Sequence, residues 1–127
     1  MVEEIVMSDQ KRIKEQKLNE FEYGLRPNGS IIGNYRDEEY KIMKYFRNPN
    51  AGGQVDLILT GRWSQSLKLK HYYKSAFLFD APLEQEYNLV GRYGLDILGI
   101  NQDWFEQRQR DIYRYVLIQD IKKILNA

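Results

Sequence analysis

Residues 55–70 constrain the fold of this chain more than any other stretch. In residues 55–60, every second side chain from Val55 onward is valine or leucine, and a period of two is typical of a half-buried β-strand. The alternation resumes at residues 67–70, and a third run follows at residues 76–80. Three such runs separated by short polar segments predict an antiparallel meander or a hairpin pair, with one apolar face and one polar face.

The composition is that of one globular domain. The chain has 127 residues, of which 43% are hydrophobic and 29% charged, so it can bury a core without disulfides. Its 19 basic and 18 acidic residues give a formal net charge of +1, without the basic excess typical of nucleic-acid binders. The lack of cysteine excludes a disulfide framework and a thiolate zinc site.

No run approaches the roughly 18 apolar residues of a membrane helix, and the N-terminus is acidic where a signal peptide is basic. We therefore expect a protein made and kept in a cytoplasm.

The first third of the chain predicts a polar helix, an arm and a short helix. Residues 1–22 have many charges and a thin apolar stripe, so this helix needs a neighbour, which is either part of the same fold or another subunit. A frayed terminus is the alternative. In residues 24–36, Pro27-Asn-Gly favours a turn, which predicts a hairpin or an extended arm. Residues 37–46 predict a short helix whose first carboxylates suit the positive end of the helix dipole.

The C-terminal half predicts two helices. One covers residues 83–93 and ends at Gly94, a natural C-terminal cap. The other covers residues 101–125 and begins with Asn101 as its N-cap. Its apolar arc is wider than one stripe, so it must pack against the sheet and against a second neighbour, either the first helix or a partner subunit. The chain is thus predicted to be a single α+β domain, 1–127, in which a small antiparallel sheet of three to five strands at 55–80 packs against a long C-terminal helix, with an N-terminal helix.

The sequence contains no motif of a known catalytic chemistry. His71 is the only histidine and has no further metal ligands at ordered spacing, and the common hydrolase signatures are absent. The glycine-rich residues 51–54 lead into a predicted strand rather than a helix N-terminus, unlike a phosphate-binding loop. The acidic run 37–39 fits the solvated first turn of a helix better than a paired acid site. We therefore expect no enzyme, no cofactor and no metal.

The last helix carries arginines interleaved with tyrosines: Arg108, Arg110 and Arg114 beside Tyr113 and Tyr115. Such a patch can stack on nucleic-acid bases, and it is equally the composition of protein interfaces. The near-neutral net charge favours the protein interface, so we expect no specific nucleic-acid partner.

The order of these motifs resembles that of a family of phage proteins. Residues Leu59-Thr-Gly-Arg-Trp-Ser-Gln-Ser-Leu67 are similar to the "L-T-G-x-L-x-x-S-hydrophobic" element of tailed-bacteriophage tail-completion and virion-morphogenesis proteins, the small neck subunits between portal and tail. In that family, alternating strands and an "R-P-F-L-G-L" segment lead to a long C-terminal helix, and residues 68–80 and 93–125 stand in those places. The chain departs from the pattern at Leu95-Asp96, where the family has Arg-Pro, and at the bulky Trp63. Upstream, residues 27–36 are similar to uncharacterised proteins of phages and prophages of Bacteroidetes, including the crAss-like group.

The resemblance implies a non-enzymatic virion subunit at the head–tail junction, made in the cytoplasm of a bacterial host. It implies a closed ring of copies, of six- or twelve-fold symmetry, that binds portal, connector or tail proteins. In such a ring each subunit offers two different patches, which we expect to be the first helix with the arm, and the outward face of the sheet with the final helix. The candidate interface residues are Leu25, Ile31, Ile32, Tyr35, Thr60, Gly61, Arg62, Trp63, Arg110, Arg114 and Tyr115.

Alternatives remain open at two levels. At the single-residue level, Trp63 either contacts a neighbour or caps the core of its own subunit. At the level of function, the alternatives are a small nucleic-acid-binding or regulatory module that uses the arginine–tyrosine patch, and a monomeric inhibitor or phage accessory protein.

Overall fold

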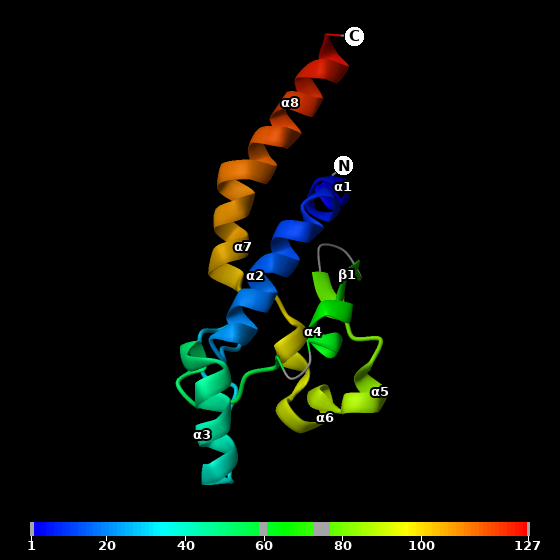
Figure 1. Ribbon diagram of the computed structural model, residues 1–127. Coiled ribbons are helices and arrows are strands. Elements are labelled where there is room, and N and C mark those ends of the chain that lie inside the picture. Colours follow the sequence, from blue (N-terminus) through cyan, green and yellow to red (C-terminus); the bar gives the residue numbers. More distant parts are fainter. Residues whose placement is uncertain (1, 59–60, 73–76, 127) are drawn as a thin grey trace.

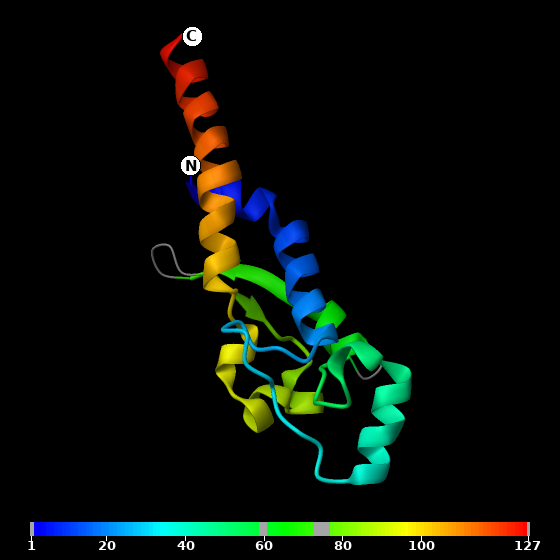
Figure 2. The ribbon, with the colours of Figure 1, turned by 90° about the vertical axis from the view of Figure 1, so that its left-hand side faces the viewer.

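The computed structural model describes residues 2–58, 61–72 and 77–126, and these residues form a mixed α+β fold (Figure 1). A long C-terminal helix runs beside two N-terminal helices, and a small antiparallel sheet contacts the N-terminal helices. Figure 2 shows the molecule from the side: the C-terminal helix projects at one end, and helix α3 lies at the other.

The elements follow one another in the order labelled in Figure 1. The N-terminal half contains α1 (Val2–Ser8), α2 (Gln10–Glu22), α3 (Glu38–Arg47), a 3-10 turn (Pro49–Ala51) and α4 (Arg62–Ser66). The sheet consists of β1 (Lys68–His71) and β2 (Phe77–Asp80). The C-terminal half contains α5 (Glu84–Tyr87), α6 (Leu89–Tyr93), a 3-10 turn (Leu95–Leu98), α7 (Gln102–Arg108), a π-helical turn (Gln109–Tyr113) and α8 (Arg114–Leu125). The last three are continuous and form the C-terminal helix.

The core lies where the N-terminal helices, the sheet and the turn 95–98 meet. Its most deeply buried apolar side chains include Val6 and Phe21 from the N-terminal helices, Phe79 from β2 and Ile97. Each retains at most 2% of its exposure, and burying such a side chain contributes about 1.5–3 kcal/mol. Helix α1 contacts both β1 and α8, so the two ends of the chain meet across this core.

The strand predicted at residues 55–60, the first of the three apolar runs, is wrong for the part that the structure describes. The alternation does report burial, because Val55 and Leu57 are both 2% exposed. The backbone, however, joins its neighbour only locally, where Val55 N–H donates to Gly33 O at 3.0 Å. The carboxylate of Asp56 then accepts the N–H of Ile58 at 3.2 Å, and this side-chain turn directs the chain away from a strand. The described sheet therefore has two strands, paired from Lys68–Asp80 to His71–Phe77, rather than three to five.

The predicted helix ends and the predicted turn are confirmed. Asp37 caps α3 by accepting the N–H of Glu39 at 3.0 Å, and Asn101 caps α7 by accepting the N–H of Trp104 at 2.9 Å. Gly94 ends α6, with its N–H donating to Val90 O at 2.8 Å. In the arm, Leu25 and Ile31 form an antiparallel bridge across the Pro27-Asn-Gly turn. Local side-chain chemistry decides each of these features, which is why sequence patterns predict them.

Two predicted helices are interrupted. The N-terminal helix breaks at Asp9, between α1 and α2. The helix predicted over residues 83–93 breaks at Asn88, which has a φ of 52° and separates α5 from α6. Asparagine tolerates this left-handed conformation better than most residues.

Helix α2 carries two buried charged side chains, Lys17 and Glu20, which are 1% and 6% exposed. Among the described residues, no hydrogen-bond partner reaches Lys17 Nζ or Glu20 Oε1. The ammonium of Lys17 lies 5.1 Å from the centre of the Phe21 ring. Burial lowers the pKa of Lys17 to about 8 and raises the pKa of Glu20 to about 7.

The raised pKa of Glu20 predicts a pH-dependent stability. The folded chain holds this proton up to about pH 7, whereas the unfolded chain releases it near 4.5. The folded state therefore binds more protons in this window, and the free energy of unfolding falls as the pH rises through it. In the variant Glu20→Gln, we expect a smaller fall between about pH 5 and 7, measured by urea denaturation. Glu15→Gln, at an exposed position of the same helix, is the control. An equal fall in wild type and Glu20→Gln would contradict the prediction.

Candidate functional site

The C-terminal helix is fastened to the N-terminal helices by the carboxylate of Asp9. The guanidinium of Arg108 donates from Nη2 to both carboxylate oxygens at 2.9 Å and from Nε at 3.2 Å. The hydroxyl of Tyr113 donates to Oδ2 at 2.5 Å. Arg108 also lies over the ring of Trp104, at 5.7 Å from its centre. Arg108 is thus engaged inside the chain and is lost from the arginine–tyrosine patch that the sequence suggested.

The π-helical turn allows both donors to reach Asp9. Residues five apart, such as Arg108 and Tyr113, point about 140° apart on a regular α-helix. The wider turn between them brings the two side chains to one side, where both donate to Asp9. Burial and then the hydrogen bond to Asp9 raise the pKa of the Tyr113 hydroxyl above its usual value. Ring contacts of Phe105 with Tyr113 (5.9 Å) and with Phe77 (6.0 Å) connect this turn to β2.

Removing the hydroxyl of Tyr113 should loosen the C-terminal helix. We expect Tyr113→Phe to lower the free energy of unfolding by about 1–3 kcal/mol, because the hydrogen bond accepted by a charged group is lost. Faster amide hydrogen exchange in residues 105–114 would report the local effect. Tyr115→Phe is the matched control, because Tyr115 is 62% exposed on the same helix. Equal exchange in wild type and Tyr113→Phe would contradict the anchoring role.

Beyond this anchor, α8 is largely exposed: none of its residues is buried in the described structure, and Leu117 is partly buried against the core. Four large apolar residues at spacings of three, three and four share one side, which we call the α8 face: Tyr115, Ile118, Ile121 and Leu125. Their exposure ranges from 42% for Ile118 to 78% for Leu125. Helices in globular proteins normally bury such a side, so the α8 face is a candidate binding surface.

Helix α3 exposes a second apolar surface at the other end of the molecule (Figure 1). Ile42, Tyr45 and Phe46 lie three and four residues apart, and we call them the α3 face. Phe46 is 77% exposed, and Ile42 is 55% exposed. The sequence predicted the helix, but it gave no sign that this apolar side turns away from the core.

The opposite side of α3 is held by a buried ion pair. Lys44 Nζ lies 2.7 Å from Asp56 Oδ1, and both side chains are almost fully buried. The amide of Asn48 donates to Asp56 Oδ2 at 2.9 Å and to the carbonyl of Glu22 at 2.6 Å. The Asp56 carboxylate therefore ties α3 and the end of α2 to the body, and Lys44 determines which side of α3 faces outward.

Removing Lys44 should destabilise the fold strongly. We expect Lys44→Ala to lower the free energy of unfolding by about 3–5 kcal/mol, because Asp56 would remain buried as an uncompensated charge. Arg47→Ala, on the exposed end of the same helix, should change it by less than about 0.5 kcal/mol. Urea denaturation of the two variants and the wild type measures both values. A cost for Lys44→Ala as small as that for Arg47→Ala would disprove the anchoring role.

The arm is fastened to the body rather than extended toward a neighbour. Arg26 Nη1 donates to Asp96 Oδ1 at 2.7 Å and to the carbonyl of Tyr93 at 2.8 Å. Of the candidate interface residues here, Ile32 is 4% exposed and belongs to the core, so its assignment to an interface was wrong. Leu25 is half-buried, and Ile31 is 39% exposed.

The last arm candidate, Tyr35, is also half-buried. Its hydroxyl accepts the N–H of Asp56 at 3.4 Å, and its ring meets Tyr40 edge-on at 4.9 Å. Burial raises the pKa of this hydroxyl above its usual value. Tyr35 therefore supports the base of α3 from inside the subunit.

The Thr60–Trp63 candidates are mostly structural. Trp63 is 3% exposed and packs 5.8 Å from Phe21, so it caps the core of its own subunit, and its expected neighbour contact was wrong. Gly61 is buried with a φ of 81°, a conformation that suits glycine, and it begins α4. Arg62 is exposed and lies 3.4 Å from Glu86. Thr60 lies outside the described residues.

The three candidates on the C-terminal helix lie on the surface. Arg110 and Arg114 are exposed, and Tyr115 belongs to the α8 face. The sequence thus identified three residues that are exposed on this helix, but it missed the α3 face and the anchoring roles of Asp9, Lys44 and Asp56. Spacing alone carries no signal for these roles, because each depends on a contact between distant segments.

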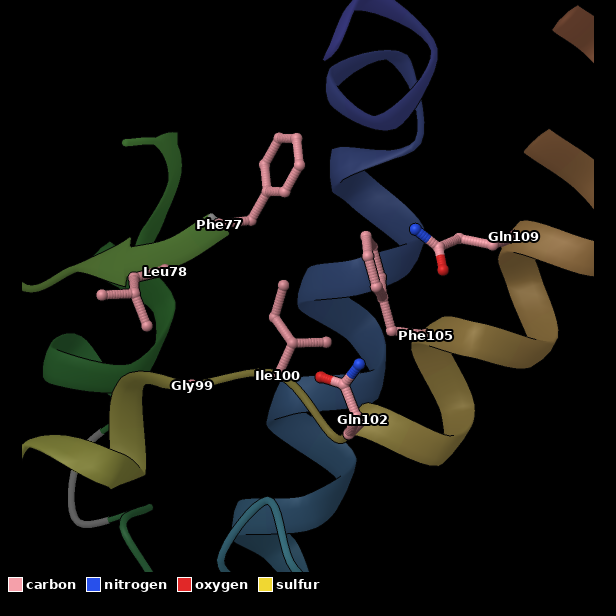
Figure 3. Close-up of a pocket in the computed structure, with 7 residues that line it drawn as sticks. All are labelled: Phe77, Leu78, Gly99, Ile100, Gln102, Phe105 and Gln109. Atoms are coloured by element: carbon pink, nitrogen blue, oxygen red, sulfur yellow. The ribbon is translucent and has the colours of Figure 1, made fainter. Parts of the chain in front are cut away.

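A cleft lies between β2 and the start of the C-terminal helix and has a volume of about 460 Å³ (Figure 3). It is lined by apolar side chains, with the amides of Gln102 and Gln109 at the helix side. This lining suits apolar contacts and amide hydrogen bonds. His71 lies near the cleft's strand, 4.9 Å from the Phe77 ring and 3.2 Å from Glu3 Oε1.

Within the described ranges, no group of three or more histidine, aspartate or glutamate side chains is arranged to hold a metal ion. The same ranges contain no helix with the length and apolar character needed to cross a membrane. Comparisons of the chain with protein-family models, curated proteins and solved structures give no match.

Proposed function

We propose that this chain is a non-enzymatic structural protein of a tailed-bacteriophage virion. In this proposal it is a neck subunit that assembles with copies of itself into a ring at the head–tail junction and docks on portal, connector or tail proteins. The observation that carries the proposal is the presence of two separate apolar helical faces, the α3 face and the α8 face, at opposite ends of one small molecule.

The amount of exposed apolar surface supports a subunit rather than a free monomer. Leu125, Phe46 and Ile124 are each more than 60% exposed, although they are large apolar side chains on helices. Contiguous surface of this kind marks protein–protein contacts. The Asp9 anchor holds the projecting helix in place, so its face is presented without a large ordering cost on binding.

The placement of the two faces supports a head-to-tail assembly. They differ in sequence and lie at opposite ends of the long axis, so one copy can engage two neighbours at once (Figure 2). Such heterologous contacts generate rings when the rotation closes and filaments when it does not. The similarity of residues 59–67 and of the motif order to phage neck proteins favours the closed ring.

The alternative is a nucleic-acid-binding or regulatory module. Of the arginines in the patch, Arg108 is engaged by Asp9, and Arg110 and Arg114 remain exposed. Nucleic-acid binding through phosphate contacts would weaken steeply with salt. An affinity for DNA or RNA that falls at least about tenfold between 50 and 200 mM salt would favour this alternative over the neck subunit.

The proposal predicts the phenotype of a phage that lacks the chain. With a stop codon at Arg12 in the phage gene, we expect filled heads and free tails that do not join, seen by electron microscopy of the lysate. Purified wild-type virions should contain the chain, and an antibody label should lie at the head–tail junction. A matched silent change at the same codon is the control. Virions without the chain, or joined particles from the stop mutant, would disprove the proposal.

A further inference from the structure

The α3 face and the α8 face differ in charge. On α3, Glu38 and Glu39 precede Ile42 by four and three residues, so both exposed carboxylates lie along the same side as the apolar side chains. Of the basic residues of α3, Lys44 is turned inward to Asp56 and Lys41 is half-buried beside Gly53. Arg47 points about 150° away from the centre of the apolar side on a regular helix. The α3 face is therefore apolar with an acidic N-terminal end.

The α8 face carries the opposite sign. Arg114 and Lys122 lie four residues before and after Ile118, so both exposed cations flank the apolar stripe. The acidic residue of this helix, Asp120, points about 150° away from the centre of the stripe on a regular helix. The α8 face is therefore apolar with basic flanks.

We propose that the α8 face of one copy of the chain binds the α3 face of the next copy. The partner is a second copy because the chain itself carries both the acidic and the basic face. Opposite charges on matching apolar stripes favour this pairing over α3 with α3 or α8 with α8, in which like charges would meet. The inference rests on the proposed neck assembly and specifies its subunit contact.

An antiparallel arrangement of the two helices allows both the apolar contacts and the contacts between opposite charges. It sets Glu38 and Glu39 opposite Lys122, and Ile42 opposite Ile118, because the spacings along the two helices agree to within a residue. Tyr45 and Phe46 then meet Tyr115. The helix dipoles also run in opposite directions in this arrangement, which is the favourable one.

The two faces cannot meet within one copy. They lie at opposite ends of the molecule in both views, with the core between them (Figures 1 and 2). Each copy therefore uses its α3 face on one side and its α8 face on the other, as a head-to-tail assembly requires.

The test uses two full-length charge-reversed variants that are expected to fail alone and to assemble together. The first is Glu38→Lys with Glu39→Lys, and the second is Arg114→Glu with Lys122→Glu. At every contact of one variant with itself, residues 38 and 39 meet a residue 122 of the same charge, so its self-association should weaken at least about tenfold. In an equimolar mixture, each variant meets the other with opposite charges at both of its faces, so association should return to the wild-type level. Sedimentation velocity over a concentration series that reaches about 1 mM detects even a contact with a Kd near 1 mM.

Single charge reversals on other sides of the same helices, Arg47→Glu and Lys123→Glu, are the matched controls and should associate like the wild type. Circular dichroism of every variant confirms that it is folded. Wild-type association that is unaffected by either double variant, or weakened by only one, would overturn the pairing. A mixture that stays as weak as its components would also overturn it, as would a wild type that is monomeric at every concentration. None of these results disproves the neck proposal, which is tested separately by the content and the joining of the virions.

Discussion

The structure depends on one buried carboxylate, that of Asp56. It pairs with Lys44 of α3, accepts the amide of Asn48 and turns its own chain through the N–H of Ile58. A buried ion must have its charge and its lone pairs satisfied, and these partners come from segments on both sides of the Gly-rich loop. The same contacts that satisfy Asp56 therefore turn the chain away from a strand and orient α3. The outward position of the α3 face is thus a consequence of the need to satisfy this charge.

Features decided by neighbours in the chain could be predicted from the sequence. The caps at Asp37 and Asn101, the turn after Arg26 and the long final helix are of this kind. The failure of the strand predicted at residues 55–60 could not be foreseen in this way. Val55 and Leu57 alternate with Asp56 as residues of a half-buried strand do, and only the tertiary partners of Asp56 show that the chain turns instead. The helical turn Arg62–Ser66 was missed for a similar reason, since five residues carry too little periodicity to identify a helix.

The candidate site was predicted in part. The wide apolar arc of the last helix pointed to a second neighbour, and Ile121 and Ile124 of this arc are exposed in the structure. Tyr35 and Trp63, in contrast, were expected at an interface as parts of the arm and of residues 60–63, yet aromatic rings also fill cores, and here they do so partly or fully. The outward orientation of the apolar side of α3 was not predicted, because lysine normally lies on the solvent side of a helix, whereas Lys44 is buried here.

The π-helical turn Gln109–Tyr113 has a consequence for how this protein tolerates sequence change. Each residue of a helix adds about 100° of rotation, so deleting or inserting one residue here would rotate all of α8 by that amount relative to α7. The α8 face would then point in another direction, while Arg108 would still hold Asp9. Substitutions in the exposed positions of this turn leave the rotation unchanged. The number of residues between Arg108 and Arg114, more than their identity, therefore determines where the projecting helix presents its apolar side.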